Sequence, residues 1–234
     1  MTRDEDERIA TFSSYVPQAV LRRLASLSSA PDEPHADRYP AALLLVDISG
    51  FTALTAAAVQ RGPAGTEQLS RSLNTYLGQI IDLIAEHGGD ISKIVGDALL
   101  PVWPAVDEDL AIATRRAAMC GQAIAASFGE FEVEGELRLS LKIGLCAGEV
   151  EATHVGGLEG RWLFLFAGDG VSQLAELEQQ MRIGDVVLPR VSFATLLIAN
   201  HDGSAREVDG LLPTGLFRSV YIGYADRFVV LVPW

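Results

Sequence analysis

The stretch LLLVDISGFT, residues 43–52, places an aspartate directly after four apolar residues and a glycine three positions further on. A short apolar run of this kind is typical of a buried β-strand, and the glycine indicates a turn that leads into a helix. Asp47 could therefore cap the helix, or it could hold a metal ion at the end of a sheet. The rest of the sequence has to decide between these two interpretations.

Composition indicates a globular protein. The chain has 234 residues, of which 49% are apolar and 21% charged, and this favours one domain with additions. The net charge of −13 argues against unspecific nucleic-acid binding, so a bound nucleotide would need metal ions to supply positive charge. No apolar run approaches the roughly 20 residues that span a bilayer. The N-terminus MTRDEDER is acidic where a secretory signal is basic. We expect a cytoplasmic protein with neither nucleic-acid nor membrane partners.

The cysteines and histidines give no evidence of a thiol or zinc site. Cys120 and Cys146 form no C-x-x-C pair and no disulfide framework, and we expect both to be buried apolar residues. The histidines lack zinc-ligand spacing, so we expect each on the surface or in a loop. They are His35, His87, His154 and His201.

The N-terminal region is predicted to precede the main domain. Residues 17–28 predict an amphipathic helix with Val20, Leu21, Leu24 and Leu27 on one face. Residues 28–40 carry three prolines and several charges, as a linker does. We therefore divide the chain into a helix and linker over 1–38, a central domain over 39–190, and a C-terminal helix and strands over 191–234 that complete the same domain.

The order of the later elements predicts the fold class. It is βαββαβ with additions, which indicates an α/β (α+β) sandwich with a mostly antiparallel sheet and helices on one face. The expected elements are a strand at 41–46, helices at 52–59 and 64–87, a hairpin at 91–103, a helix at 107–128, strands at 137–152 and 161–168, a helix at 171–181, a strand at 185–189, a short helix near 191–198, and strands at 219–224 and 227–232.

This topology brings a second carboxylate beside the first. Asp97 lies at the tip of the hairpin, next to the strand that ends at Asp47. Carboxylate oxygens suit Mg²⁺, and two ions could activate an attacking hydroxyl and stabilise a leaving phosphate. The loop after Asp47 also offers free backbone N–H groups to a phosphate. Alone, each signal is more often a capped turn or an ordinary hairpin tip, but together they favour a nucleoside triphosphate site.

Three motifs extend this interpretation to a known family. VDISGFTALT, GGDISKIVGDALLPVW and LKIGLCAGEV resemble, in order and spacing, the catalytic domain of class III nucleotidyl cyclases, from about Tyr39 to Leu188. The first catalytic half of bicarbonate-responsive soluble adenylyl cyclases looks most similar. The resemblance implies a ferredoxin-like core that converts ATP or GTP into a 3′,5′-cyclic nucleotide and pyrophosphate, with two Mg²⁺ (or Mn²⁺) ions.

The resemblance also implies site residues. Asp47 and Asp97 match the two metal-binding aspartates, and the carbonyl of Ile48 would be the usual backbone ligand. Lys93 matches a lysine that reads adenine in homodimeric members and lies in the anion-responsive site of the soluble-type first half, although a solvent-facing strand lysine fits equally well. The phosphate-binding loop is matched by Ser49, Gly50, Phe51 and Thr52.

Other positions depart from the family pattern. Ser172 and Glu176 stand where complete sites carry an Asn that orients the ribose and an Arg that stabilises charge on the α-phosphate. Losing one such electrostatic contact costs on the order of a hundredfold in rate. Leu165 replaces an adenine-reading residue, and Ala175 replaces the anion-binding Arg. We expect the metal-donating half of a composite dimeric site, nearly inactive as a homodimer, with the complementary half supplied in cis or in trans.

Three alternatives remain. The chain could be a catalytically degenerate regulatory module that binds nucleotide or an anion without turnover. The start LLLVDISGFT is also reminiscent of haloacid-dehalogenase-type phosphatases, but Ser49 stands where their general acid is required. HGGDIS is similar to the diguanylate cyclase motif, but it precedes the strand here instead of forming the hairpin turn.

Overall fold

The structure is a computed structural model that describes residues 3–13, 15–133, 137–181, 183–189, 192, 217–222 and 228–233. Its strands are β1 (His35–Ser49), β2 (Asp90–Val95), β3 (Ala98–Pro104), β4 (Glu130–Val133), β5 (Leu137–Gly156), β6 (Trp162–Ala167), β7 (Val186–Pro189), β8 (Phe217–Ile222) and β9 (Phe228–Pro233). Its helices are α1 (Arg3–Ser13), α2 (Gln18–Ser26), α3 (Phe51–Gln60), α4 (Pro63–Glu86), α5 (Leu110–Phe128) and α6 (Asp169–Leu177), with 3₁₀ turns η1 (Leu158–Gly160) and η2 (Glu178–Gln180).

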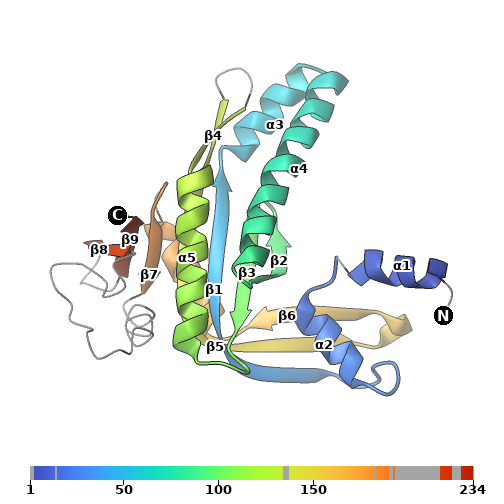
Figure 1. The fold of residues 1–234 in the computed structure, drawn as a ribbon. Helices are drawn as coiled ribbons and strands as arrows, with labels where there is room; N and C mark the ends of the chain where they lie inside the picture. Colours follow the sequence, from blue (N-terminus) through green and yellow to red (C-terminus); the bar gives the residue numbers. More distant parts are fainter. Residues whose placement is uncertain are drawn as a thin grey trace.

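The nine strands of the described residues form one sheet in the order β2-β3-β1-β5-β7-β9-β8, with β4 and β6 also paired to β5. Strand pairs are antiparallel except β5 with β7. Taken in chain order, β1, α4, β2, β3, α5 and β5 give the βαββαβ core, and Figure 1 shows α4 and α5 lying along the sheet. The predicted fold class is therefore confirmed.

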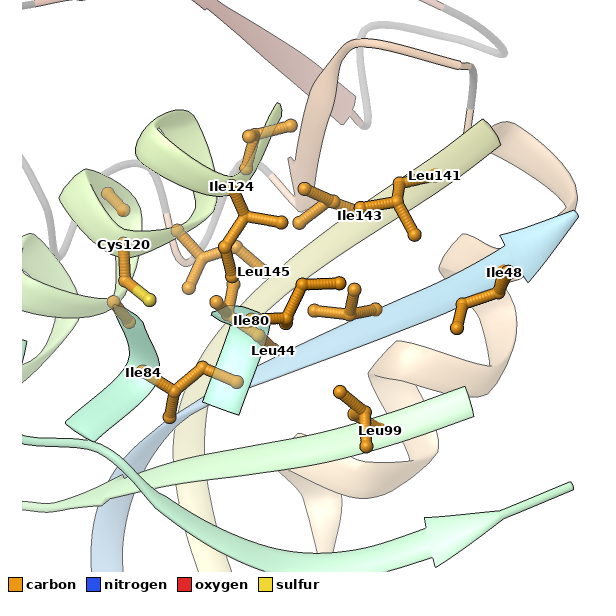
Figure 2. Close-up of a cluster of buried hydrophobic side chains, with 14 of the residues drawn as sticks. Leu44, Ile48, Ile80, Ile84, Leu99, Cys120, Ile124, Leu141, Ile143 and Leu145 are labelled. Carbon is orange, nitrogen blue, oxygen red and sulfur yellow. The ribbon is translucent and has the colours of Figure 1, made fainter. Parts of the chain in front are cut away.

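Alternation along β1 divides the core into two clusters. Ala42, Leu44 and Val46 belong to the larger cluster, which includes buried residues of α4 and α5 such as Ile80 and Ile124. Figure 2 shows this cluster, with side chains from both helices meeting those of the strands. The sheet is thus covered on this face by two long helices.

The second cluster lies on the opposite face of β1. It contains Ala41 and Leu43 of β1, together with Leu174 and Leu177 of α6 and Met181, the residue after η2. Helices therefore cover both faces of the sheet, and the expectation of helices on one face is wrong. The reason is that residues 41–46 are apolar at every position, so both faces of β1 need a cover.

The N-terminal region differs from its prediction in three ways. Helix α1 was not expected. Strand β1 already begins at His35, inside the predicted linker, because the long strand β5 pairs with it as far as His154. Pro40 is tolerated there, because its backbone faces the side of β3, whose register with β1 begins only at Ala41, so the missing N–H breaks no strand pair. Its carbonyl on that side accepts the Ala105 N–H at 2.8 Å. Helix α2 lies where expected, but none of its residues is buried, and Leu24 is 45% exposed.

The C-terminal strands β8 and β9 join the sheet through β7. The expected helix near 191–198 falls outside the described residues except for Ser192, a buried helical residue whose hydroxyl accepts the Ala147 N–H at 2.9 Å. Among the helices that the structure describes, none is long and apolar enough to cross a membrane. The division into 1–38, 39–190 and 191–234 remains a prediction.

Candidate active site

Asp47 lies where β1 leaves its neighbour β3. It is paired with Ala98 of β3 and with Lys142 of β5, and beyond it the register continues only with β5. The residue is half-buried and continues the β1 face that carries Ala41 and Leu43. The strand thus ends its apolar run by holding a carboxylate at the rim of the sheet.

Asp97 lies beside it. Gly96 and Asp97 form the two-residue turn between β2 and β3, closed by the Val95–Ala98 pair. Gly96 has φ +63°, the left-handed conformation that tight hairpin turns demand and that favours glycine. Because Asp97 directly precedes Ala98, the register partner of Asp47, the structure brings together the two carboxylates that the sequence predicted as a pair.

The charges around Asp47 fit a bound cation. Burial raises the pKa of Asp47, the nearby charge of Asp97 raises it further, and Lys142 lowers it. Glu178, in the turn after α6, adds a weaker effect that raises this pKa. The two carboxylates therefore repel each other at a half-buried site, and a divalent ion between them would relieve that repulsion.

The described residues contain no cluster of three or more His, Cys, Asp or Glu side chains able to hold a metal ion. Two carboxylates need further oxygen ligands from the backbone, from water or from a substrate, and this is the mode of binding that Mg²⁺ prefers. Ile48 offers only its backbone, because its side chain is 3% exposed and packs in the larger core cluster. The donor set thus fits Mg²⁺ or Mn²⁺ and does not resemble a zinc centre.

The predicted phosphate loop forms the connection from β1 to α3. Gly50 has φ +96° and precedes Phe51, the first residue of the helix. Its carbonyl accepts the Leu54 N–H at 3.1 Å, which closes the first helical turn. The N–H groups of that turn have no partners within the helix, so the loop between Ser49 and Thr52 can donate hydrogen bonds to an anion.

Lys93 lies on the edge strand β2 and is exposed. The register shifts between Ile91 and Lys93, where the buried Ser92 hydroxyl donates to the Leu100 carbonyl at 2.8 Å. Among the described residues, no ion pair or hydrogen bond joins Lys93 to Asp47 or Asp97. The structure therefore leaves Lys93 as an exposed residue of β2, away from direct contact with the carboxylate pair.

Lys142 is the site residue that the sequence interpretation missed. It is half-buried, stands opposite Asp47 in the register, and lowers the pKa of that carboxylate. Its flanking residues Leu141 and Ile143 are buried, so a lysine interrupts a core strand. That interruption in LKIGL is the sequence signal that could have identified it.

The four positions that depart from the family pattern lie on α6 and β6. Ser172, Ala175 and Glu176 are on the exposed side of α6, and Leu165 of β6 is 45% exposed. The Ser172 hydroxyl donates to the carbonyl of Gly168 one turn earlier, at 3.2 Å. None of these side chains contributes to the buried face of α6, so packing does not dictate their identity.

The fold and the carboxylate pair define a nucleotidyl cyclase domain of class III. The chain belongs to the adenylate and guanylate cyclase catalytic domain family, whose model matches residues 35–202. This confirms the resemblance drawn from the three motifs, and the match begins at the first residue of β1.

Relatives support the same assignment. Adenylate cyclase type 10 of Oryctolagus cuniculus is 33% identical over 186 residues, which are 79% of this chain and 11% of that protein. The chain thus spans about a tenth of the length of this relative. The dimeric guanylyl cyclase domain of the RhoGC fusion protein from Blastocladiella emersonii has a TM-score of 0.62 at 19% identity, covering 86% of this chain and 98% of that one. The catalytic core of a rhodopsin-guanylyl cyclase in complex with ATPalphaS has a TM-score of 0.61 at 18% identity, covering 86% of this chain and 99% of that one.

Proposed function

We propose that this chain is the metal-donating half of an adenylate cyclase, which forms 3′,5′-cyclic AMP and pyrophosphate from ATP at a site shared with a complementary cyclase half. The observation that carries the proposal is the pairing of Asp47 and Asp97 at the rim of the sheet, where the charge of Asp97 adds to burial in raising the pKa of Asp47. Repulsion between two carboxylates has no structural benefit, but it prepares a site for divalent ions.

The reaction is an internal phosphoryl transfer. The ribose 3′-oxygen forms a bond to the α-phosphorus, the bond from that phosphorus to the oxygen bridging to the β-phosphate breaks, pyrophosphate leaves, and the 3′-hydroxyl proton goes to solvent. Two Mg²⁺ (or Mn²⁺) ions would supply a lowered pKa for that hydroxyl and neutralise charge on the phosphates. Asp47, Asp97 and the Ile48 carbonyl would hold them.

The chain's remaining groups would bind and orient the triphosphate. The open N–H groups between Ser49 and Thr52 donate hydrogen bonds to phosphate oxygens. Lys142, adjacent to Asp47, adds a positive charge on the side of β5. Lys93 would supply recognition of the adenine or of an anion from the edge strand. These contacts fix the α-phosphate for attack, and such positioning accounts for much of the catalysis in phosphoryl transfer.

The complementary half would supply what this chain lacks. Ser172 and Glu176 cannot orient a ribose and stabilise phosphate charge as Asn and Arg do. Both lie on an exposed helix face near an exposed apolar strand, β6, where Leu163 is 65% exposed. On the edge strand β2, Ile94 is likewise 57% exposed. Exposed apolar side chains at these two strands fit burial against a partner.

One specific observation favours a second candidate. A carboxylate at Glu176, in place of a cation, opposes the charge that develops in the transition state. A regulatory cyclase module that binds ATP or another anion without turnover would tolerate it. Retention of both Asp47 and Asp97 argues for the enzyme. The expected cytoplasmic location stays a prediction under either function.

Cyclic AMP formation from ATP separates the two candidates. The chain would be assayed with Mg²⁺ or Mn²⁺, first alone and then mixed with a cyclase half that carries the Asn and the Arg. Product that forms only on mixing supports the composite enzyme. No product in either case, with ATP still binding in the presence of metal, supports the regulatory module. GTP in parallel reactions tests the choice of base.

A further inference from the structure

A cavity of about 370 Å³ lies at the opposite end of β1 from the carboxylate pair. Its wall combines helix α2 with the first residues of β1, the last part of β5 and the loop after β3. Figure 1 shows α2 lying against the extended strands β1 and β5 in this region. The cavity is independent of the nucleotide site, because Asp47 and Asp97 do not line it.

Two polar side chains of the wall have unsatisfied hydrogen-bonding groups. His154 of β5 is only 9% exposed, and neither of its ring nitrogens has a hydrogen-bond partner. The hydroxyl of Tyr39 on β1 is also buried without a partner. The expected loop or surface position of His154 is therefore wrong, since the ring lies against Phe164 with centroids 5.2 Å apart. Buried polar groups normally have a hydrogen-bond partner, so these two side chains are available to hydrogen-bond a ligand.

Helix α2 presents arginines to the cavity. Ala19, Arg22, Arg23 and Ser26 share one side of the helix and line the wall, while Leu24 is left 45% exposed. An isolated amphipathic helix would be expected to turn its leucines inward. Here Arg22 is exposed and Arg23 is half-buried along the cavity, so this side of α2 is open to a charged group.

The arginines of α2 form no ion pair with an acidic side chain of the described residues. Arg38 on the same wall pairs with Glu151 at 2.6 Å, and Asp37 pairs with His35 at 2.8 Å. Among the residues that the structure describes, no ion pair or hydrogen bond involves the guanidinium group of Arg22 or Arg23, although the charge of Arg22 lowers the pKa of Asp90 and of Tyr39. Asp107 is the remaining acidic side chain of the wall. Three arginines and two aspartates therefore line the wall, which is a local cationic excess on a protein whose net charge is −13.

We propose that this cavity binds a small organic anion, whose carboxylate or phosphate lies against Arg22 and Arg23 and whose body contacts the apolar part of the wall. The guanidinium groups match both anions in geometry and charge. His154 and Tyr39 would supply hydrogen bonds to the same ligand, and Ala19, with neighbouring apolar residues, its nonpolar contacts.

Such a ligand would fasten α2 to the catalytic sheet. Apart from the cavity wall, α2 is attached through the Gln18 N–H, which donates to the Asp90 carboxylate at 2.7 Å. Asp90 is the first residue of β2, whose far end leads into the turn that carries Asp97. An anion at Arg22 and Arg23 would therefore bridge the segment preceding the domain and the sheet that holds the metal ligands.

Binding of phenyl phosphate and benzoate tests the proposal, with benzyl alcohol as the uncharged comparison. Titration calorimetry would compare the wild-type chain with R22Q/R23Q and with the matched control R61Q/R71Q, which removes the same charge from two exposed arginines, one directly after α3 and one in α4. We expect an anionic probe to bind the wild type and the control with affinities within twofold of each other. R22Q/R23Q should bind at least tenfold more weakly.

Hydrogen exchange supplies a second readout that a purely structural arginine would not change. The bound anion should slow exchange of the α2 amides in the wild type and not in R22Q/R23Q. Three outcomes would overturn the proposal: no binding of either anion to the wild type, equal binding to R22Q/R23Q, or displacement of the probe by ATP with Mg²⁺. Displacement would place the anion in the nucleotide site instead.

Discussion

The two ends of β1 hold opposite kinds of site. At its C-terminal end, Asp47 meets Asp97, and two negative groups repel each other at the rim of the sheet. At its N-terminal end, Arg22 and Arg23 border a cavity beside the unpartnered His154. We propose cations at one end and an anion at the other, while the apolar residues between them hold the strand in the core.

The difference teaches where a stable sheet can carry unfavourable groups. The middle of β1 pairs on both sides and packs on both faces, so any unsatisfied group there would cost stability. The pairing with β3 covers only Ala41 to Asp47, so β1 extends beyond this neighbour at both ends. Charged or unsatisfied groups that destabilise the fold therefore lie where the fewest packing and pairing contacts depend on them.

Removing a carboxylate should break the first of these sites. Asp47→Ala or Asp97→Ala is expected to abolish metal-dependent ATP binding. The activity of the composite enzyme should then fall by at least about a hundredfold. The fold should survive, because both residues lie at turns or strand ends. ATP titrations with and without Mg²⁺ would measure this, with Asp82→Ala on the exposed side of α4 as the control. Unchanged ATP–Mg affinity in the variants would refute the metal assignment.

Restoring the missing groups should make this chain self-sufficient. In the double variant Ser172→Asn, Glu176→Arg, a homodimer would contain both halves of the site, so cyclic AMP production by the chain alone should rise about a hundredfold or more. Glu86→Arg, an equal charge change at the exposed end of α4, should leave the rate unaltered. If the double variant folds, binds ATP and still shows no gain, this pair of residues does not explain the predicted inactivity.

Asp90→Ala should loosen the connection between the two ends. The carboxylate accepts the first N–H of α2, and losing such a cap costs about 1 kcal/mol, or roughly a fivefold increase in opening. Amide exchange of α2 should accelerate by that factor while exchange of α4 stays constant. Asp90→Asn keeps an acceptor and should exchange nearly as the wild type does. Unchanged α2 exchange in Asp90→Ala would show that the cavity wall alone holds the helix.

The smallest expected effect is on stability. Burial and Asp97 raise the pKa of Asp47 in the folded state, so folded protein binds that proton more tightly than unfolded protein does, and stability falls as pH rises through this window. Asp47→Asn should therefore have a higher Tm than the wild type at neutral pH in metal-free buffer. The difference should shrink as the pH falls toward 3.8, the ordinary value for this carboxyl. A lower Tm at neutral pH would contradict the repulsion between the carboxylates.

Much of the carboxylate end of β1 could be predicted from sequence because its signals are local. The run before Asp47, the turn glycine at 50 and the Gly96-Asp97 hairpin each indicate their structure within a few residues. The pairing of Asp47 with Asp97 followed from the order of elements alone. Lys142 was missed because its role depends on register with β1, which no single stretch of sequence reveals.

The N-terminal end was predicted less well because tertiary pairing decides its structure. Prolines 31, 34 and 40 indicated a linker, but β5 extends far enough to pair residues 35–40 as strand. His154 appeared to be a scattered polar residue, yet the same extension buries it. The leucines of α2 indicated an inward apolar face, whereas no residue of the helix is buried, Leu24 is exposed, and Arg22 and Arg23 line the cavity.

The burial of the two native thiols allows the motion of α2 to be followed with cysteines introduced on the surface. Cys120 and Cys146 are fully buried, and burial raises the pKa of both, that of Cys120 to about 12. Neither will form a thiolate at neutral pH or react with a maleimide. A cysteine introduced on the outer side of α2 and another on α4 would accept a pair of fluorophores without background labelling, and their energy transfer would report the docking of this helix in real time.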